Sequence, residues 1–144
     1  MATSYCFMAV HIVFSTKERY RFLEGELGRL MHEYIGGIIG SLKGEPIIIN
    51  GMADHVHILC MLPKELSIAD FMRLLKTNSS KWYREKHNPK FNWQVGYGAF
   101  TVSKSSMDSV YQYIAAQKEH HAKMPFEDEL KALLSKHGME YLGD

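Results

Sequence analysis

Pro46-Ile47-Ile48-Ile49-Asn50-Gly51-Met52-Ala53, followed directly by Asp54-His55-Val56-His57-Ile58-Leu59, predicts two strands joined by a very short turn. Side chains of an extended strand alternate between its two faces, so His55 and His57 point the same way and Val56 points the other way. Along one strand these two imidazoles lie about 7 Å apart. They can bind a single metal ion if another residue supplies a third ligand.

Helix and strand patterns on both sides of this hairpin predict the order β-α-β-β-α-β-α with a short C-terminal helix. The expected strands are Tyr5–Phe14, Ile47–Ala53, His55–Leu62 and Phe91–Val102, and the expected helices are Leu23–Leu42, Ser67–Glu85, Met107–Lys123 and Phe126–His137. This order is typical of an α+β, ferredoxin-like (RRM-like) domain, an antiparallel sheet with helices on one face, here a single domain over residues 1–144. The first strand is apolar on both faces, so we expect it to be central and covered on both sides.

The composition is that of an ordinary globular domain, with 46% hydrophobic and 23% charged residues and a net charge of +1. Because the net charge is so small, any surface that binds nucleic acid must be local. Cys6 and Cys60 form no CxxC pair, which favours two buried thiols in a reducing cytosol over a zinc site or a disulfide. The apolar stretches are too short to cross a membrane and the N-terminus has no signal-peptide pattern, so we expect a cytoplasmic protein without a membrane partner.

The His-Val-His pattern is short, and two strand histidines without a metal ion explain it at least as well. The helix expected over Met107–Lys123 adds Tyr113 and Gln117, which are four residues apart and share one face. An amide oxygen is a reasonable ligand for a hard divalent ion, and two imidazoles with one amide leave coordination positions open for catalysis. The phenol of Tyr113 is then a candidate nucleophile, and the alternative is an aromatic side chain that packs on the sheet. Tyr111 lies about 200° away around the helix and cannot face the same site.

These motifs resemble a known family. Asp54-His55-Val56-His57 together with Tyr113-x-x-x-Gln117 resembles the small single-tyrosine transposases of the HUH (His-hydrophobic-His) superfamily, which move bacterial insertion sequences as single-stranded DNA. The pattern is also similar to the REP-associated tyrosine transposases. The segments His11–Lys17, Trp93–Phe100 and Tyr113–His121 carry further likeness, so the resemblance covers residues 5 to 142.

The resemblance implies a DNA transposase that cleaves and rejoins single-stranded DNA carrying hairpin-forming ends. A divalent ion, Mg²⁺ or Mn²⁺, would be held by His55, His57 and Gln117. Tyr113 would attack a phosphodiester to form a 5′-phosphotyrosine and release a 3′-hydroxyl, which can later reverse the reaction. The resemblance also implies a homodimer, whose active sites can combine residues of both subunits.

Two groups of basic residues are candidates for contacts with DNA phosphates, although a charged helix face is more often simply solvated. They are Lys17, Arg19 and Arg21 around Tyr20, and Arg73, Lys76, Lys81 and Arg84 on the second helix. The ring of Tyr20 is a candidate for stacking on an unpaired base.

Two other functions stay open from the sequence alone. A domesticated relative of the same fold would bind hairpin-forming DNA and no longer transpose. An RNA-binding domain of this fold would stack bases on aromatic residues of its central strands, but Phe7 and Phe14 fall on opposite faces of the first one. We expect His11 to be a buried sheet histidine, and His120 and His121 to lie either beside Gln117 or on the surface.

Overall fold

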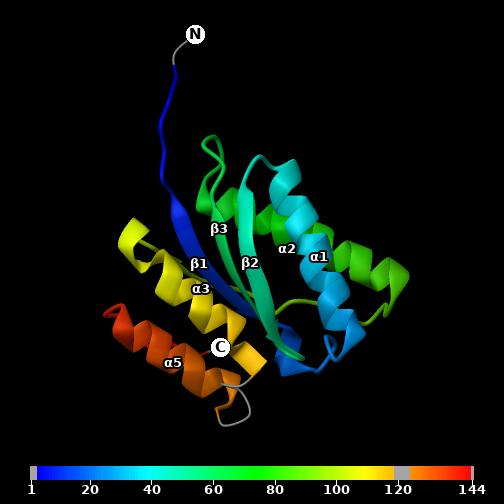
Figure 1. The fold of residues 1–144 in the computed structure, drawn as a ribbon. Coiled ribbons are helices and arrows are strands. Elements are labelled where there is room, and N and C mark those ends of the chain that lie inside the picture. The colour runs from blue at the N-terminus through cyan, green and yellow to red at the C-terminus, as the bar shows by residue number, and fades with distance from the viewer. Residues whose placement is uncertain (1–2, 119–123, 144) are drawn as a thin grey trace.

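A computed structural model describes residues 3–118 and 124–143 of the chain (Figure 1). The strands are β1 (Ala9–Ser15), β2 (Glu45–Met52), β3 (His55–Met61) and β4 (Gly98–Thr101), and the helices are α1 (Glu26–Ser41), α2 (Ile68–Lys86), α3 (Met107–Ala115) and α5 (Phe126–Lys136). Short 3₁₀ turns span Lys17–Arg19 and Lys104–Ser106. The sheet has the order β2-β3-β1-β4 with antiparallel pairs throughout, which confirms the predicted ferredoxin-like fold. None of the helices in these ranges is long and apolar enough to cross a membrane.

Helices cover both faces of this sheet. The core beneath α1 and α2 contains Val10, Ile12, Phe14, Val56, Ile58 and Cys60, while Ala9, Val13, Leu59 and Phe100 pack with residues of α3 and α5 on the other face. The expectation of helices on one face therefore holds for α1 and α2 alone, and α3 and α5 lie side by side against the opposite face (Figure 1). The cause is the apolar character of β1 on both faces, which correctly predicted a strand covered on both sides.

The β2–β3 hairpin has the short turn that its sequence predicts, and Gly51 is the residue that allows it. Gly51 pairs with Val56 across the hairpin. A Cβ atom at position 51 would lie 2.2 Å from the carbonyl oxygen of His55, so no larger residue fits without moving the backbone. This close approach sets the position of His55 at the start of β3.

The first strand begins four residues later than predicted. Ala9 is the first residue of β1 and pairs with Met61, the last residue of β3, so residues 5–8 extend beyond the end of β3. As a result Tyr5 is 92% exposed and Cys6 is exposed, which corrects the prediction of two buried thiols. Cys60 is buried as predicted, and burial raises the pKa of its thiol to about 12.

The fourth strand is much shorter than predicted and covers Gly98–Thr101 alone. Gly96 has a φ of 94°, which turns the chain out of the extended conformation. Lys76 of α2 fastens this turn, because its ammonium donates to the carbonyl oxygens of Gln94 at 2.6 Å and Gly96 at 2.7 Å. Trp93 makes an isolated bridge to Thr16 instead of a strand pairing.

The third helix ends earlier than predicted, at Ala115. Asn50 of β2 donates its side-chain amide to the carbonyl oxygens of Ile114 at 3.0 Å and Ala115 at 3.3 Å, and so satisfies two carbonyl groups at the helix end. Gln117 lies just past this end, and the remainder of the predicted helix, over 119–123, lies outside the described residues.

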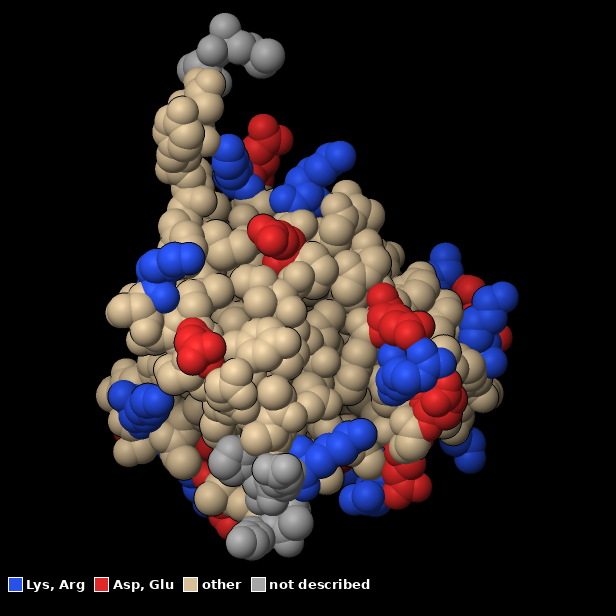
Figure 2. Space-filling view, in the orientation of Figure 1, with Lys and Arg blue, Asp and Glu red and all other residues tan. Residues whose placement is uncertain are grey.

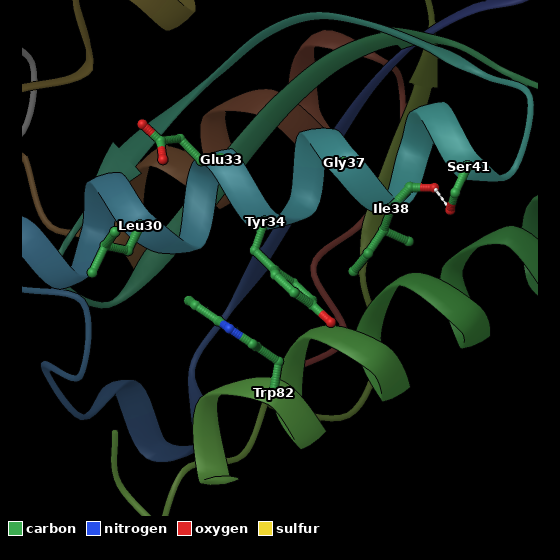
Figure 3. Close-up of a pocket in the computed structure, with 7 residues that line it drawn as sticks. All are labelled: Leu30, Glu33, Tyr34, Gly37, Ile38, Ser41 and Trp82. Carbon is green, nitrogen blue, oxygen red and sulfur yellow. Dashed lines mark hydrogen bonds between the residues drawn. The ribbon is translucent and has the colours of Figure 1, made fainter. Parts of the chain in front are cut away.

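The outer faces of α1 and α2 meet through aromatic stacking. Tyr34 of α1 and Trp82 of α2 have ring centroids 4.4 Å apart and nearly parallel planes. Figure 3 shows the two rings at a cavity of about 480 Å³ that Leu30, Gly37 and Ile38 also line. This cavity is on the opposite side of the sheet from α3 and α5 (Figure 1).

We expect the protein to lose stability in acid, because the imidazole of His32 in α1 is partly buried. Its Nε2 is buried without a hydrogen-bond partner among the described residues, and burial, followed by the charge of Lys118, lowers its pKa to about 4. Between about pH 6.5 and pH 4 the unfolded state then binds more protons, so the free energy of unfolding falls as the pH falls. We expect protonation of His32 to lower the free energy of unfolding by about 2 kcal/mol between pH 7 and pH 5.

Urea unfolding at both pH values measures this effect, and His32→Leu should remove it. The matched control is His87→Leu, because His87 is exposed at the end of α2. Equal pH dependence in the two variants would mean that His32 is not the source.

Candidate active site

Five side chains from three regions of the chain converge on one buried point between the sheet and α5. They are His55 and His57 of β3, Tyr113 of α3, Gln117 just after α3, and Glu129 of α5. The structure thus brings together the four residues that the sequence singled out and adds Glu129, which it did not.

The carboxylate of Glu129 is the centre of this cluster. Its Oε1 lies 3.0 Å from Nε2 of His57 and 3.4 Å from Nε2 of His55. Its Oε2 accepts a hydrogen bond from the amide nitrogen of Gln117 at 2.8 Å and another from the hydroxyl of Tyr113. The amide oxygen of Gln117 lies 3.2 Å from Nε2 of His55, so the glutamine joins the carboxylate to the imidazole.

Both imidazoles are oriented by partners on their outer nitrogens. Nδ1 of His55 lies 2.7 Å from Oδ1 of Asp54, and Nδ1 of His57 lies 2.8 Å from Nε2 of His11. Each ring therefore directs Nε2 toward the centre of the cluster, as metal-binding histidines do when a second group holds their other nitrogen. His11 is a buried sheet histidine as predicted, and burial, reinforced by His57, lowers its pKa to about 3, so it is neutral at physiological pH.

The buried charges of the cluster compensate one another. Burial alone would raise the pKa of the Glu129 carboxyl, but hydrogen bonds from His55, His57 and Tyr113 outweigh it and lower the pKa well below its usual range. Burial likewise works to lower the pKa of His55, and its hydrogen bonds to Asp54 and Glu129 raise it overall. An ionised carboxylate thus faces a histidine that favours its charged form.

This donor set fits a divalent metal ion. One ligand atom each from His55, His57 and Glu129 lie within 4.8 Å of one another, and all three residues are buried. Two imidazole nitrogens and a carboxylate oxygen are common ligands of divalent ions, and a cation would replace the proton shared between histidine and carboxylate. The cluster can therefore hold a divalent metal, with the amide oxygen of Gln117 beside it.

Tyr113 lies beside the histidines of its own chain. Its ring centroid is 5.8 Å from that of His57 and 6.1 Å from that of His11, and burial followed by the contact with Glu129 raises the pKa of its hydroxyl. A phenol in this state is a weak nucleophile until a nearby positive charge favours the phenolate. Tyr111 is 39% exposed and does not contact the cluster in the described residues, in agreement with its predicted position on the helix.

Glu129 was missed although its helix was predicted correctly, because the local sequence does not say where the short C-terminal helix packs. The buried residues of α5 are Phe126, Glu129 and Leu133, spaced as one helical face. A carboxylate in the middle of an apolar stripe was the available signal, since a buried acidic residue needs partners. Phe126 completes the contact, because its ring stacks on His55 with centroids 4.5 Å apart.

The first group of predicted DNA-binding residues lies at the same end of the sheet as His55. Arg19 forms an ion pair with Glu127 of α5 at 3.4 Å, and Arg21 pairs with Glu24 at 2.6 Å. Lys17 lines a cavity of about 510 Å³ together with Tyr20 and Arg21. These residues remain candidates for contacts with DNA, and Arg19 also anchors α5.

The second group belongs to α2, on the other side of the sheet from the cluster. Burial lowers the pKa of Lys76 to about 8, and its ammonium is held by the two carbonyl groups of the turn before β4. Arg73 pairs with Asp70 at 3.6 Å and Arg84 donates to the carbonyl oxygen of Phe91 at 3.4 Å, while Lys81 is exposed. This stripe is therefore remote from the candidate site, and Lys76 has a structural role in the loop.

Two remaining predictions concern the surface. His120 and His121 lie outside the described residues. An RNA-binding platform on the sheet is excluded for the described residues, because helices cover both sheet faces and Phe14 is buried against Trp93. Figure 2 shows acidic and basic side chains interspersed around a largely uncharged centre on the face in view, so this face has no extended basic patch.

The ferredoxin-like sheet places His55 and His57 on β3 with Tyr113 beside them, which is the arrangement that the resemblance to the HUH transposases implies. The model of the family "Transposase IS200 like" matches residues 4–117. The transposases of insertion sequence element IS200 from Salmonella typhimurium and Salmonella typhi are 32% identical over 120 residues, which is 76% of this chain and 76% of each relative. The chain therefore belongs to the family of IS200-like transposases.

Two solved structures share the fold. A crystal structure of a protein from Deinococcus radiodurans R1, described as a candidate transposase, has a TM-score of 0.63 at 24% identity over 81% of this chain and 96% of its own. A REP-associated tyrosine transposase bound to a REP hairpin also has a TM-score of 0.63, at 14% identity over 100% of this chain and 91% of its own.

Proposed function

We propose that this transposase cleaves and rejoins single-stranded DNA through a covalent 5′-phosphotyrosine at Tyr113, with the help of a divalent metal ion. The observation that carries the proposal is the convergence of the Tyr113 hydroxyl and both histidines on one carboxylate, that of Glu129. A nucleophile and a set of metal ligands thus share one buried centre, beside which a phosphodiester can be attacked.

The chain's own residues have separate tasks in this reaction. His55, His57 and Glu129 would hold Mg²⁺ or Mn²⁺, with Gln117 as the further ligand that the sequence predicts. The ion, when bound, supplies positive charge that polarises the scissile phosphate. Glu129 orients the Tyr113 hydroxyl by accepting its hydrogen bond.

The bond changes conserve energy. Oη of Tyr113 forms a bond to phosphorus and loses its proton, while the bond from phosphorus to the 3′-oxygen breaks and that oxygen leaves as a 3′-hydroxyl after gaining a proton. The phosphotyrosine retains a phosphodiester, so a 3′-hydroxyl of another strand can attack it and release Tyr113. Cutting and rejoining then require no nucleotide cofactor.

We propose single-stranded DNA with hairpin-forming ends as the partner. The REP-associated relative bound to a REP hairpin supports this choice, because it shares the fold over the whole chain. A homodimer remains a prediction from the family resemblance. The contact between Tyr113 and the histidine cluster of the same chain supports a site in which each subunit uses its own tyrosine.

The alternative function is that of a domesticated relative, which binds hairpin DNA without transposing. Intact His55, His57, Tyr113 and Gln117 around a buried carboxylate favour retained cleavage, because a binding module has no need of a buried charged cluster.

The test is incubation of the whole protein with a hairpin-bearing single-stranded oligonucleotide and Mg²⁺ or Mn²⁺. We expect a covalent protein–DNA adduct that survives denaturing electrophoresis and is absent when a chelator replaces the metal. A fully duplex oligonucleotide of the same sequence is the control and should give no adduct. Binding of the hairpin without an adduct, across oligonucleotides taken from the DNA that flanks the gene, would favour the domesticated relative.

A further inference from the structure

A cleft of about 690 Å³ opens beside the candidate active site, between α3, β4 and α5. Tyr113 and Glu129 line it, and its walls also include Phe100, Ser106, Ser109, Ala132 and Lys136. Three other cavities, between α1 and α2, beside the Lys17–Arg19 turn and at the start of α1, do not reach Tyr113. A strand that presents a phosphate to Tyr113 can therefore enter through this cleft.

The walls of the cleft differ in chemistry. Met124, which is 41% exposed, and Ala132 of α5 contribute apolar surface, whereas Ser106 and Ser109 at the start of α3 contribute hydroxyl groups. An unpaired nucleobase has apolar faces and hydrogen-bonding edges, so it matches a site with one apolar wall and one hydroxyl wall.

The charges also suit a nucleotide. Lys136 brings a positive charge to the cleft, where it can lie beside a backbone phosphate. Within residues 3–118 and 124–143, Glu129 is the one acidic side chain that lines the cleft, and its carboxylate is engaged by the histidines, Tyr113 and Gln117. The negative charge nearest to the strand is thus already compensated.

We propose that this cleft binds one unpaired nucleotide next to the scissile phosphate, so that the chain itself contacts the base at the cleavage point. The inference rests on the proposed function, since it takes Tyr113 as the nucleophile. It goes beyond family membership, because α5 forms one wall of the cleft. The family model matches residues 4–117 and therefore does not include α5.

The experiment measures binding, without chemistry, in the presence of a chelator. Fluorescence anisotropy compares a labelled hairpin oligonucleotide having a single-stranded tail with two versions that carry an abasic position on one or the other side of the cleavage point. We expect one of the two abasic positions to weaken binding to the wild type by about tenfold, the value of one lost stacking contact.

Variants that fill the cleft should remove this dependence. Ala132→Trp and Ser109→Trp place a large ring in the cleft from opposite walls, and both should bind the intact and abasic oligonucleotides equally. Ser135→Trp and Gln112→Trp are the matched controls, because these exposed residues of α5 and α3 lie outside the cleft, and they should keep the tenfold difference. Thermal unfolding checks that each variant folds. If Ala132→Trp displaces α5, the result for Ser109→Trp decides the test.

The possible failures are distinguishable. If neither abasic position weakens binding, or if the filled variants keep the difference, the cleft does not hold the nucleotide, whatever the result of the adduct assay. If the dependence is present and removed as expected but the wild type forms no adduct with Mg²⁺ or Mn²⁺, the cleft binds DNA and the proposed chemistry is wrong.

Discussion

Tyr113→Phe is expected to lower the rate of covalent adduct formation by a factor on the order of 10⁴ or more, to background. The substitution removes the attacking oxygen and its hydrogen bond to Glu129, but leaves the ring in contact with His57 and His11. The site should therefore keep its shape and lose only its nucleophile. Denaturing electrophoresis of the protein with labelled oligonucleotide measures the adduct directly.

Tyr111→Phe is the matched control, because Tyr111 lies on the same helix and is 39% exposed away from the cluster. It should form adduct at the wild-type rate. If the adduct survives in Tyr113→Phe and disappears in Tyr111→Phe, Tyr111 is the nucleophile and the proposal for Tyr113 is wrong. That result would also contradict the geometry of α3.

Glu129→Gln is expected to abolish most of the stabilisation that a divalent ion confers on the folded protein. At a metal concentration of about 100 times the dissociation constant, the wild type gains about 2.7 kcal/mol, a rise in Tm of roughly 8 °C. Loss of the charged ligand should weaken binding by about 100-fold, which reduces the gain at the same concentration to about 0.4 kcal/mol. Thermal unfolding with Mn²⁺, and separately with Mg²⁺, measures this difference without reference to activity.

Glu127→Gln serves as the control, since Glu127 lies two residues before Glu129, off the buried face of α5, and pairs with Arg19. It should respond to metal as the wild type does. Equal metal responses in the Glu129 and Glu127 variants would exclude Glu129 as a ligand. In that case Gln117→Leu should lose the response instead, as the ligand set His55, His57 and Gln117 requires.

The order of elements followed from local patterns, because strand and helix periodicity, caps and turns depend on neighbouring residues. The two-residue turn between Met52 and His55 required a hairpin, and Ser67 begins α2 by accepting a hydrogen bond from the backbone amide of Asp70. Three of the boundaries that were wrong, at the starts of β1 and β4 and at the end of α3, depend on distant partners. Met61, Lys76 and Asn50 decide them, and each lies far away in the sequence.

In the candidate site, too, local sequence patterns determined some features and packing determined the others. His55 and His57 share a face because a strand alternates, and Tyr113 and Gln117 were paired by helical spacing, so the sequence alone determined that these residues form two pairs. That the pairs meet is a result of packing α3 on the face of β3 that carries the histidines. Gln117 reaches His55 although the helix ends before it, which helical spacing did not foresee.

Only the tertiary structure decided that a carboxylate lies at the centre. Glu129 comes 72 residues after His57, on a helix whose place in the fold no local pattern specifies. The apolar stripe of α5 buries Glu129, and a buried carboxylate must find hydrogen-bond donors, which His55, His57, Tyr113 and Gln117 provide. The sequence by itself determined the fold and two pairs of site residues, His55 with His57 and Tyr113 with Gln117. Packing of α3 on β3 brought the pairs together. Docking of α5 placed the carboxylate of Glu129 between them, because burial of the apolar face of α5 carries Glu129 against the sheet.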